Sequence, residues 1–164
     1  MAAFVASTVA HDVERQSADL LAIKMGITKI FKGDNVVLKT DGYCYSAYAT
    51  GAAGDQFVGI AAETVDNRYS VEGDSSSAAA AAGDRTCDCW QNGIIDRDYP
   101  AANAAIQTDL GLPVYCAVGT ATDDHPRAVI KSTAGKETAC GKIVGIISAS
   151  KVRVVIQAWG AVET

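Results

Sequence analysis

The sequence predicts an all-β protein, a small β-barrel or sandwich with a weak internal duplication and an extended N-terminal arm. Short runs rich in Val and Ile recur between Gly- and Asp-containing turn signals, which is typical of many short strands. The apolar run Gln56–Ala62 also returns as Lys142–Ser148. Each run has a central glycine, Gly59 or Gly145, which in a buried strand admits a neighbouring backbone or a bulge. Because each run follows a Val-rich segment, we interpret the two as equivalent strands.

The first part of the chain divides into an arm and a set of short strands. Residues 1–19 show no hydrophobic period and predict an arm, with a short helix as the alternative; residues 20–164 predict a single β-barrel domain. In residues 20–31, β-branched and aromatic residues broken by Gly26 indicate two strands. A hairpin signal, Thr40-Asp41-Gly42, then separates two further strand-like runs, Val36–Leu38 and Tyr43–Ala47.

Gly-Asp pairs predict further turns, because glycine tolerates positive φ and aspartate can accept hydrogen bonds from nearby backbone amides. The pairs are Gly33-Asp34, Gly54-Asp55 and Gly83-Asp84. Residues 66–83 are rich in Ser and Ala and predict a flexible loop, in which five consecutive alanines could alternatively form one helical turn.

The second half predicts more strands and one short helix. Residues 86–91 alternate like a strand, Asn92-Gly93 predicts a turn, and Ile94 would begin the next strand. A short helix is expected over residues 101–109. The last strand, Lys151–Trp159, alternates polar and apolar side chains, which predicts one wet face and one buried face.

Composition excludes several function classes. The chain has 164 residues, with 14 basic against 19 acidic residues and a formal net charge of -5, which argues against binding to nucleic acid. No apolar run approaches the roughly 18 residues that a membrane span needs. The N-terminus has no basic region before an apolar block, so we expect a mature, cytosolic start. The five cysteines are an odd number, so we expect reduced thiols.

Cys87 and Cys89 are the strongest metal-ligand candidates, because a spacing of two places both sulfurs on one face of a strand. Zinc needs four ligands, however, and the other three cysteines stand singly, at Cys44, Cys116 and Cys140. The favoured interpretation is therefore that these cysteines are small apolar core residues. No metal and no cofactor is predicted.

Other candidate catalytic groups are weaker still. Asp96 and Asp98 could pair for hydrolysis, but a turn with Arg97 as local counterion is favoured. The two histidines, His11 and His125, leave little material for acid–base chemistry, and His125 is assigned to a solvated loop beside Asp123 and Asp124. Gly141-Lys142 is not a phosphate-binding loop, since position 136 is lysine and Ile143 follows. Trp90 and Trp159 are interpreted as core or interface anchors rather than sugar platforms. No catalytic residue is predicted, and the protein is not expected to be an enzyme.

The order of motifs resembles the capsid decoration, or cement, proteins of tailed bacteriophages. The resemblance covers roughly residues 14–159 and rests on loose strand and turn motifs: Glu14-Arg15, Ile30–Leu38, Asp41-Gly42-Tyr43, Phe57–Ala61, Gly83-Asp84, Asp109–Tyr115 and Val144–Ile147. It implies a small β-barrel that forms homo-oligomers, with a trimer favoured, and binds the major capsid protein. The location would be the outer capsid surface of the virion, after synthesis in the host cytoplasm. The arm would lie across capsid subunits, whereas the 66–83 loop departs from the family's tighter hairpins.

Three functional hypotheses follow. The first is a structural virion protein that stabilises capsomer contacts and contacts neither nucleic acid nor membrane. The second is a carbohydrate- or receptor-binding module of a phage head or tail fibre, for which an aromatic content of 7% gives limited material. The third is a small hydrolase that uses Asp96 and Asp98, or a metal at Cys87 and Cys89.

Overall fold

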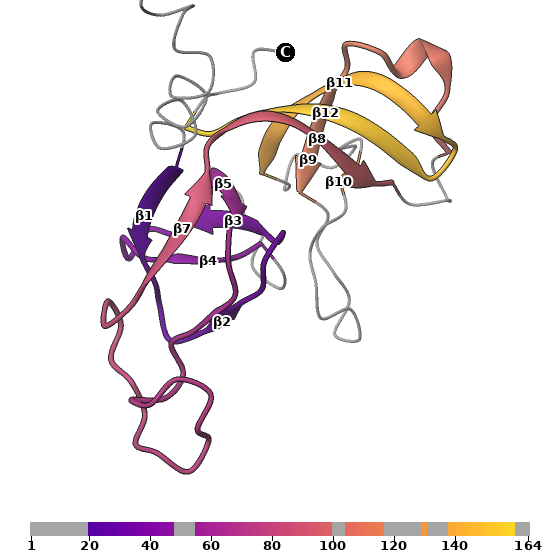
Figure 1. Ribbon diagram of the computed structural model, residues 1–164. Helices are drawn as coiled ribbons and strands as arrows, with labels where there is room; N and C mark the ends of the chain where they lie inside the picture. Colours follow the sequence, from indigo (N-terminus) through magenta and orange to yellow (C-terminus); the bar gives the residue numbers. More distant parts are fainter. Residues whose placement is uncertain (1–19, 48–54, 100–103, 117–128, 131–137, 160–164) are drawn as a thin grey trace, which may run out of the picture.

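The computed structural model describes residues 20–47, 55–99, 104–116, 129–130 and 138–159. These residues form β-strands and turns with one short 3-10 turn, η2 (Gln107–Asp109), and they contain no α-helix (Figure 1). The all-β prediction is confirmed. The helix expected over 101–109 is wrong for residues 104–109, the described part of that range. Ile106 has extended backbone angles of φ -126° and ψ 162°, and only the three residues of η2 form a helical turn, of the 3-10 type.

Ten strands form two five-stranded antiparallel sheets, and two form a separate pair. The first sheet has the order β1 (Leu20–Lys24), β7 (Thr86–Trp90), β5 (Gln56–Ala61), β3 (Asn35–Leu38) and β4 (Cys44–Ser46). The second has the order β8 (Asn92–Asp98), β12 (Lys151–Gln157), β11 (Ala139–Ser148), β9 (Pro113–Cys116) and β10 (Val129–Ile130). The separate pair is β2 (Lys29–Ile30) with β6 (Val65–Asp66).

The two sheets have the same topology, which confirms the internal duplication. In each, a central strand (β5 or β11) pairs with the Val-rich strand before it (β3 or β9), and that strand pairs with the one between them (β4 or β10). On its other side, the central strand pairs with the last strand of its sheet (β7 or β12), which the first strand (β1 or β8) flanks. The predicted runs are thus equivalent strands.

The equivalent glycines, however, are Gly59 and Gly141 rather than Gly59 and Gly145. A register shift next to Gly59 in the β3–β5 pairing has its counterpart next to Gly141 in the β9–β11 pairing. At both positions an added Cβ would collide with a backbone carbonyl oxygen of the next strand, that of Trp90 or of Val155. At Gly145 the nearest atom would be the Arg153 Cβ, at 3.3 Å. The close approach of the neighbouring backbone therefore explains why residue 141 is a glycine. The expectation that Gly145 admits a neighbouring backbone is wrong.

The first sheet closes into a small barrel. Past the end of β1, Met25 forms a bridge with Cys44 of β4, and the Gly26 amide donates to the Cys44 carbonyl oxygen at 3.1 Å. The barrel interior holds ten buried apolar residues: Ile23, Met25, Ile30, Val36, Cys44, Val58, Ala61, Val65, Cys87 and Cys89. Closure leaves this unit with a core of its own.

The outer face of the barrel contributes to a second core shared with the other sheet. Side chains alternate along a strand, so Val36 and Val58 point into the barrel while Val37 and Phe57 belong to the second core. The second sheet supplies its buried face, including Val152 of β12. The alternation predicted for β12 is confirmed, because its odd-numbered residues are exposed or half-buried and its even-numbered residues are buried.

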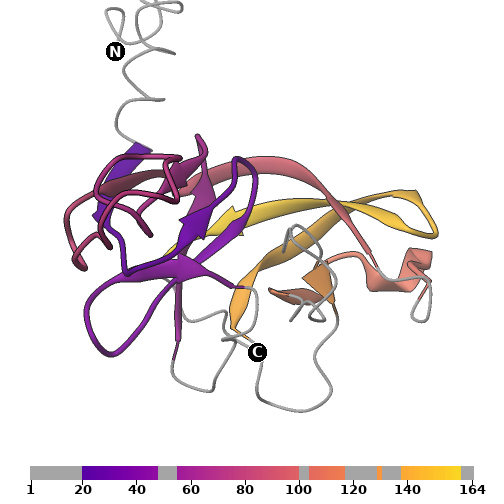
Figure 2. The ribbon, with the colours of Figure 1, turned by 90° about the horizontal axis from the view of Figure 1, so that it is seen from below.

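The two sheets are joined by one nearly continuous ribbon, since only Gln91 separates β7 from β8 (Figures 1 and 2). The turn predicted at Asn92-Gly93 is therefore wrong. Both residues belong to β8, where they lie opposite Gln157 and Ile156. Gly93 has a φ of 149° inside the strand, near the bend of the ribbon, a conformation that glycine adopts more easily than other residues.

The other local signals in the first half agree with the structure. The two strands expected in residues 20–31 are β1 and β2, and the predicted hairpin joins β3 to β4 with Gly42 at φ 83°. In both described Gly-Asp pairs, the aspartate accepts a backbone hydrogen bond: Asp34 from the Phe31 amide at 2.9 Å and Asp84 from the Ala81 amide at 2.7 Å.

Residues 66–83 form an irregular excursion that is hydrogen-bonded to the barrel. The fully buried Asn67 side chain donates to the carbonyl oxygens of Gly26 at 3.0 Å and Ala81 at 3.1 Å. The Arg85 guanidinium donates to three carbonyl oxygens, of Asp66, Tyr69 and Ser70. The alanines form a bridge and turns, not a helical turn. The flexibility of this loop stays a prediction.

Candidate functional site

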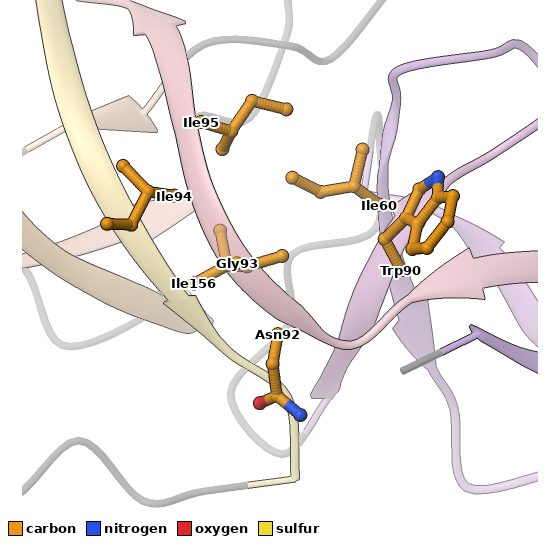
Figure 3. Close-up of a pocket in the computed structure, with 7 residues that line it drawn as sticks. All are labelled: Ile60, Trp90, Asn92, Gly93, Ile94, Ile95 and Ile156. Atoms are coloured by element: carbon orange, nitrogen blue, oxygen red, sulfur yellow. The ribbon is translucent and has the colours of Figure 1, made fainter. Parts of the chain in front are cut away.

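An apolar pocket lies where the ribbon bends from one sheet into the other. It is a pocket of about 180 Å³, in which Ile60 of β5 and Ile95 of β8 face one another (Figure 3). Its lining residues are Ile60, Trp90, Asn92, Gly93, Ile94, Ile95 and Ile156. Four isoleucines and one tryptophan with a single polar side chain make it suited to an apolar group rather than to a sugar.

The pocket is lined by four consecutive residues of β8, which is the edge strand of its sheet. Ile94 and Ile95 point to opposite faces of the strand, and both line the pocket. Ile94 is 67% exposed, the largest exposed fraction among the large apolar side chains of the described residues.

No motif in the sequence predicts this site. Its residues come from β5, β7, β8 and β12, and each of them alone is an ordinary strand residue. Only the pairing of Trp90 with Ile60 and of Ile94 with Val155 brings them together.

The five cysteines are all buried free thiols within the two cores. The sulfurs of Cys87 and Cys89 lie 3.9 Å apart on one face of β7, as their spacing predicts. Burial, with a smaller effect of Cys87, raises the pKa of Cys44 to about 12. The hydrogen bond with Cys87 and then burial raise the pKa of Cys89, and the hydrogen bond with Cys140 and then burial raise that of Cys116. These protonated thiols favour the interpretation as core residues.

Thiol chemistry offers a direct test of that interpretation. At pH 8, a soluble thiol reagent is expected to leave all five cysteines unmodified in the folded protein and to modify all five after unfolding, because burial denies the reagent access to the sulfurs. A Ser76→Cys variant, on an exposed turn, is the positive control and should react within minutes. Rapid modification of any native cysteine would contradict the assignment.

Asp96 and Asp98 lie on β8, and the local pairing expected with Arg97 is wrong. Asp96 receives two hydrogen bonds from Arg153 of β12, at 2.8 and 3.3 Å, and these lower the pKa of its carboxyl. Asp98 lies opposite Lys151. Arg97 points to the other face, is buried, and donates to the Gly33 carbonyl oxygen at 2.8 Å. The strand period separates Arg97 from both aspartates.

The remaining candidates fall into two groups. Trp90 is half-buried and lines the pocket, whereas Trp159 follows β12 and is 42% exposed. His11 and His125, with Asp123 and Asp124, lie outside the described residues. Within the described residues, no group of three or more His, Cys, Asp and Glu side chains is arranged to hold a metal ion.

Comparisons with known proteins add no assignment. No protein-family model matches the sequence, and no curated protein matches it significantly. In the part of the chain that the structure describes, no helix is long and apolar enough to cross a membrane.

Proposed function

We propose that this protein is a non-enzymatic structural component of a phage virion that binds the outer surface of the capsid shell and stabilises contacts between capsomers. One observation supports a structural role most directly. The candidate catalytic side chains singled out above have structural environments where they are described. The thiols are buried in the two cores, and Asp96 forms a surface ion pair with Arg153. The phage assignment itself rests on the resemblance of the sequence motifs.

The partner in this proposal is the major capsid protein, and the active form is a homo-oligomer, a trimer by preference. The protein is acidic, with a net charge of -5, and its described strands form two five-stranded sheets and a separate pair. Many copies on a symmetric lattice convert weak individual contacts into durable attachment, because each added contact is intramolecular once the first has formed.

The decisive measurement is the copy number of the chain in purified particles, determined by quantitative mass spectrometry against the most abundant capsid protein. A ratio near one, or a simple fraction of one, is expected for a protein that covers the lattice. A handful of copies would instead favour the receptor-binding module of a head or tail fibre. Absence from particles would overturn the virion assignment.

Deleting residues 1–19 is expected to leave the described β-structure folded and to weaken attachment to capsids by about tenfold or more, because a wrapping segment contributes contacts that the core alone lacks. Cosedimentation of the purified variant with capsids that lack the protein measures attachment, and circular dichroism measures folding. A variant with Ser75 and Ser76 replaced by alanine, in the exposed turn, is the control. Equal attachment of the deletion variant and the full chain would exclude a role for the arm.

A further inference from the structure

One edge of β8 is unpaired over the whole strand in the part of the chain that the structure describes. The Tyr99 amide donates to the Ser150 carbonyl oxygen at 2.8 Å, and the Ala158 amide donates to the Gln91 carbonyl oxygen at 3.0 Å. Because direction alternates along an antiparallel strand and the β8–β12 register is unbroken, odd-numbered residues of β8 bond to β12. The backbone groups of its even-numbered residues therefore point outward, on the side of the ribbon that lies uppermost in Figure 2.

This edge lacks the features that commonly keep a strand edge from pairing with another chain. β8 has seven residues without proline or lysine, and its pairing with β12 has no bulge. Each of its acidic side chains is matched by a basic residue of β12, since Asp96 accepts hydrogen bonds from Arg153 and Asp98 lies opposite Lys151. In the middle of the edge, Ile94 is 67% exposed. The edge is therefore open to another strand.

The backbone of β8 is complementary to a second copy of itself. When a two-fold axis passes beside Ile95, all seven residues of one β8 pair with all seven of the other, in the antiparallel direction. Even-numbered residues then face even-numbered residues, so the outward groups of the two strands form about eight hydrogen bonds. On the face toward the core, Arg97 lies opposite the second copy's Gly93, which has no side chain to crowd it.

The outer side chains are also compatible in this register. Asp96 lies opposite the second copy's Ile94, and Asp98 lies opposite its Asn92, whose side-chain amide can donate to the carboxylate. The two Asp96 carboxylates are diagonal neighbours, and each is held by its own Arg153. Any other symmetric register shortens the pairing. The register centred on Asp96 would also set two aspartates directly against each other, which is unfavourable.

We propose that two copies of this chain pair through the free edges of β8 about a two-fold axis at Ile95, which joins their second sheets into one continuous sheet. The contact adds backbone hydrogen bonds and brings the two exposed Ile94 side chains together as diagonal neighbours. Because one strand from each copy buries little surface, the dimer dissociates on dilution. A two-fold contact is separate from the contacts of a trimer, and the inference does not depend on the capsid role.

Hydrogen exchange of the intact protein, resolved by residue with NMR at two protein concentrations, tests this. The outward amides of Ile94 and Asp96 should exchange at least about threefold more slowly at about 1 mM than at about 20 µM, because pairing protects them. The amides of Ile95 and Arg97, which bond to β12, are an internal reference and should not depend on concentration. Protection of Ile94 and Asp96 that is the same at both concentrations would show that the chain covers its own edge, and would overturn the proposal. Rapid exchange at both would also overturn it.

Two substitutions at Ile94 test the register, with sedimentation equilibrium as the measure of association. Ile94→Asp should weaken dimerisation at least about tenfold, because the new carboxylate faces the second copy's Asp96, whereas Ile94→Lys should preserve it, because the ammonium group faces that carboxylate. Both add one charge at a largely exposed site, so urea denaturation should give similar stabilities for the two variants.

A Ser75→Asp variant, on an exposed turn away from β8, controls for net charge and should dimerise like the parent protein. Equal association of the Ile94→Asp variant and the parent would overturn the proposal. So would an equal loss of association in the Asp and Lys variants at Ile94, because a contact without this register does not distinguish the two charges.

Discussion

Replacing Gly141 with alanine is expected to lower the free energy of unfolding by about 3 kcal/mol, and Gly59→Ala should have a comparable effect. At Gly141 the new methyl group would collide with the Val155 carbonyl oxygen, so two paired strands would have to separate. At Gly59 the collision is with the Trp90 carbonyl oxygen, and the φ of 139° adds backbone strain. Equilibrium denaturation with urea measures both.

Gly145→Ala is the control for these two variants. Its methyl group would meet the Arg153 Cβ at 3.3 Å, which a small shift of the side chain relieves, so the expected change is below about 1 kcal/mol. The sequence pattern alone assigns the close backbone approach to Gly145 and does not mark Gly141. A Gly145 variant as unstable as the Gly141 variant would show that the strand register described above is incorrect.

Asn67→Asp is expected to destabilise the protein by about 3 kcal/mol at pH 7. The Asn67 amide nitrogen donates to the Gly26 and Ala81 carbonyl oxygens in a fully buried site. A carboxylate at this position would place its acceptor oxygens against those carbonyl oxygens, with no donor between them. Burial would raise the pKa of the new carboxyl in the folded state. Stability relative to the parent protein should therefore be recovered as the pH falls through that pKa, and lost again as it rises.

Urea denaturation of the Asn67→Asp variant and the parent at pH 7 and pH 4.5 tests the sign of this effect. Asn67→Ala, which removes the donors without adding a charge, should cost about 2 kcal/mol and show no such pH dependence. If the Asp variant were as stable as the parent at pH 7, the hydrogen bonds of Asn67 would not hold residues 66–83 to the barrel.

Much of the fold could be predicted because its signals are local. The glycine-centred runs mark β5 and β11, Asp41-Gly42 marks the hairpin, and the polar alternation of Lys151–Gln157 marks β12. Each depends on residues that are neighbours in the sequence. Strand period and turn chemistry therefore suffice to find them.

The errors arose where distant pairing decides the structure. Asn92-Gly93 is a strong local turn signal, but pairing with β12 keeps both residues extended. Gly141 lies outside the matching apolar run, and its role depends on a carbonyl oxygen of β12. Arg97 has Asp96 and Asp98 as neighbours in sequence but bonds to Gly33 in the other unit. The pocket was missed for the same reason, because four separate strands build it.

The single residue between β7 and β8 restricts how the length of the chain can change. Side chains alternate with a period of two, so one extra residue at Gln91 would exchange the two faces of β8 relative to β7. Arg97 would then face solvent and Asp96 would enter the core. Insertions in surface turns carry no such penalty, because a loop absorbs added residues at small entropic cost. Length variation among natural variants should therefore accumulate in the turns and avoid this junction.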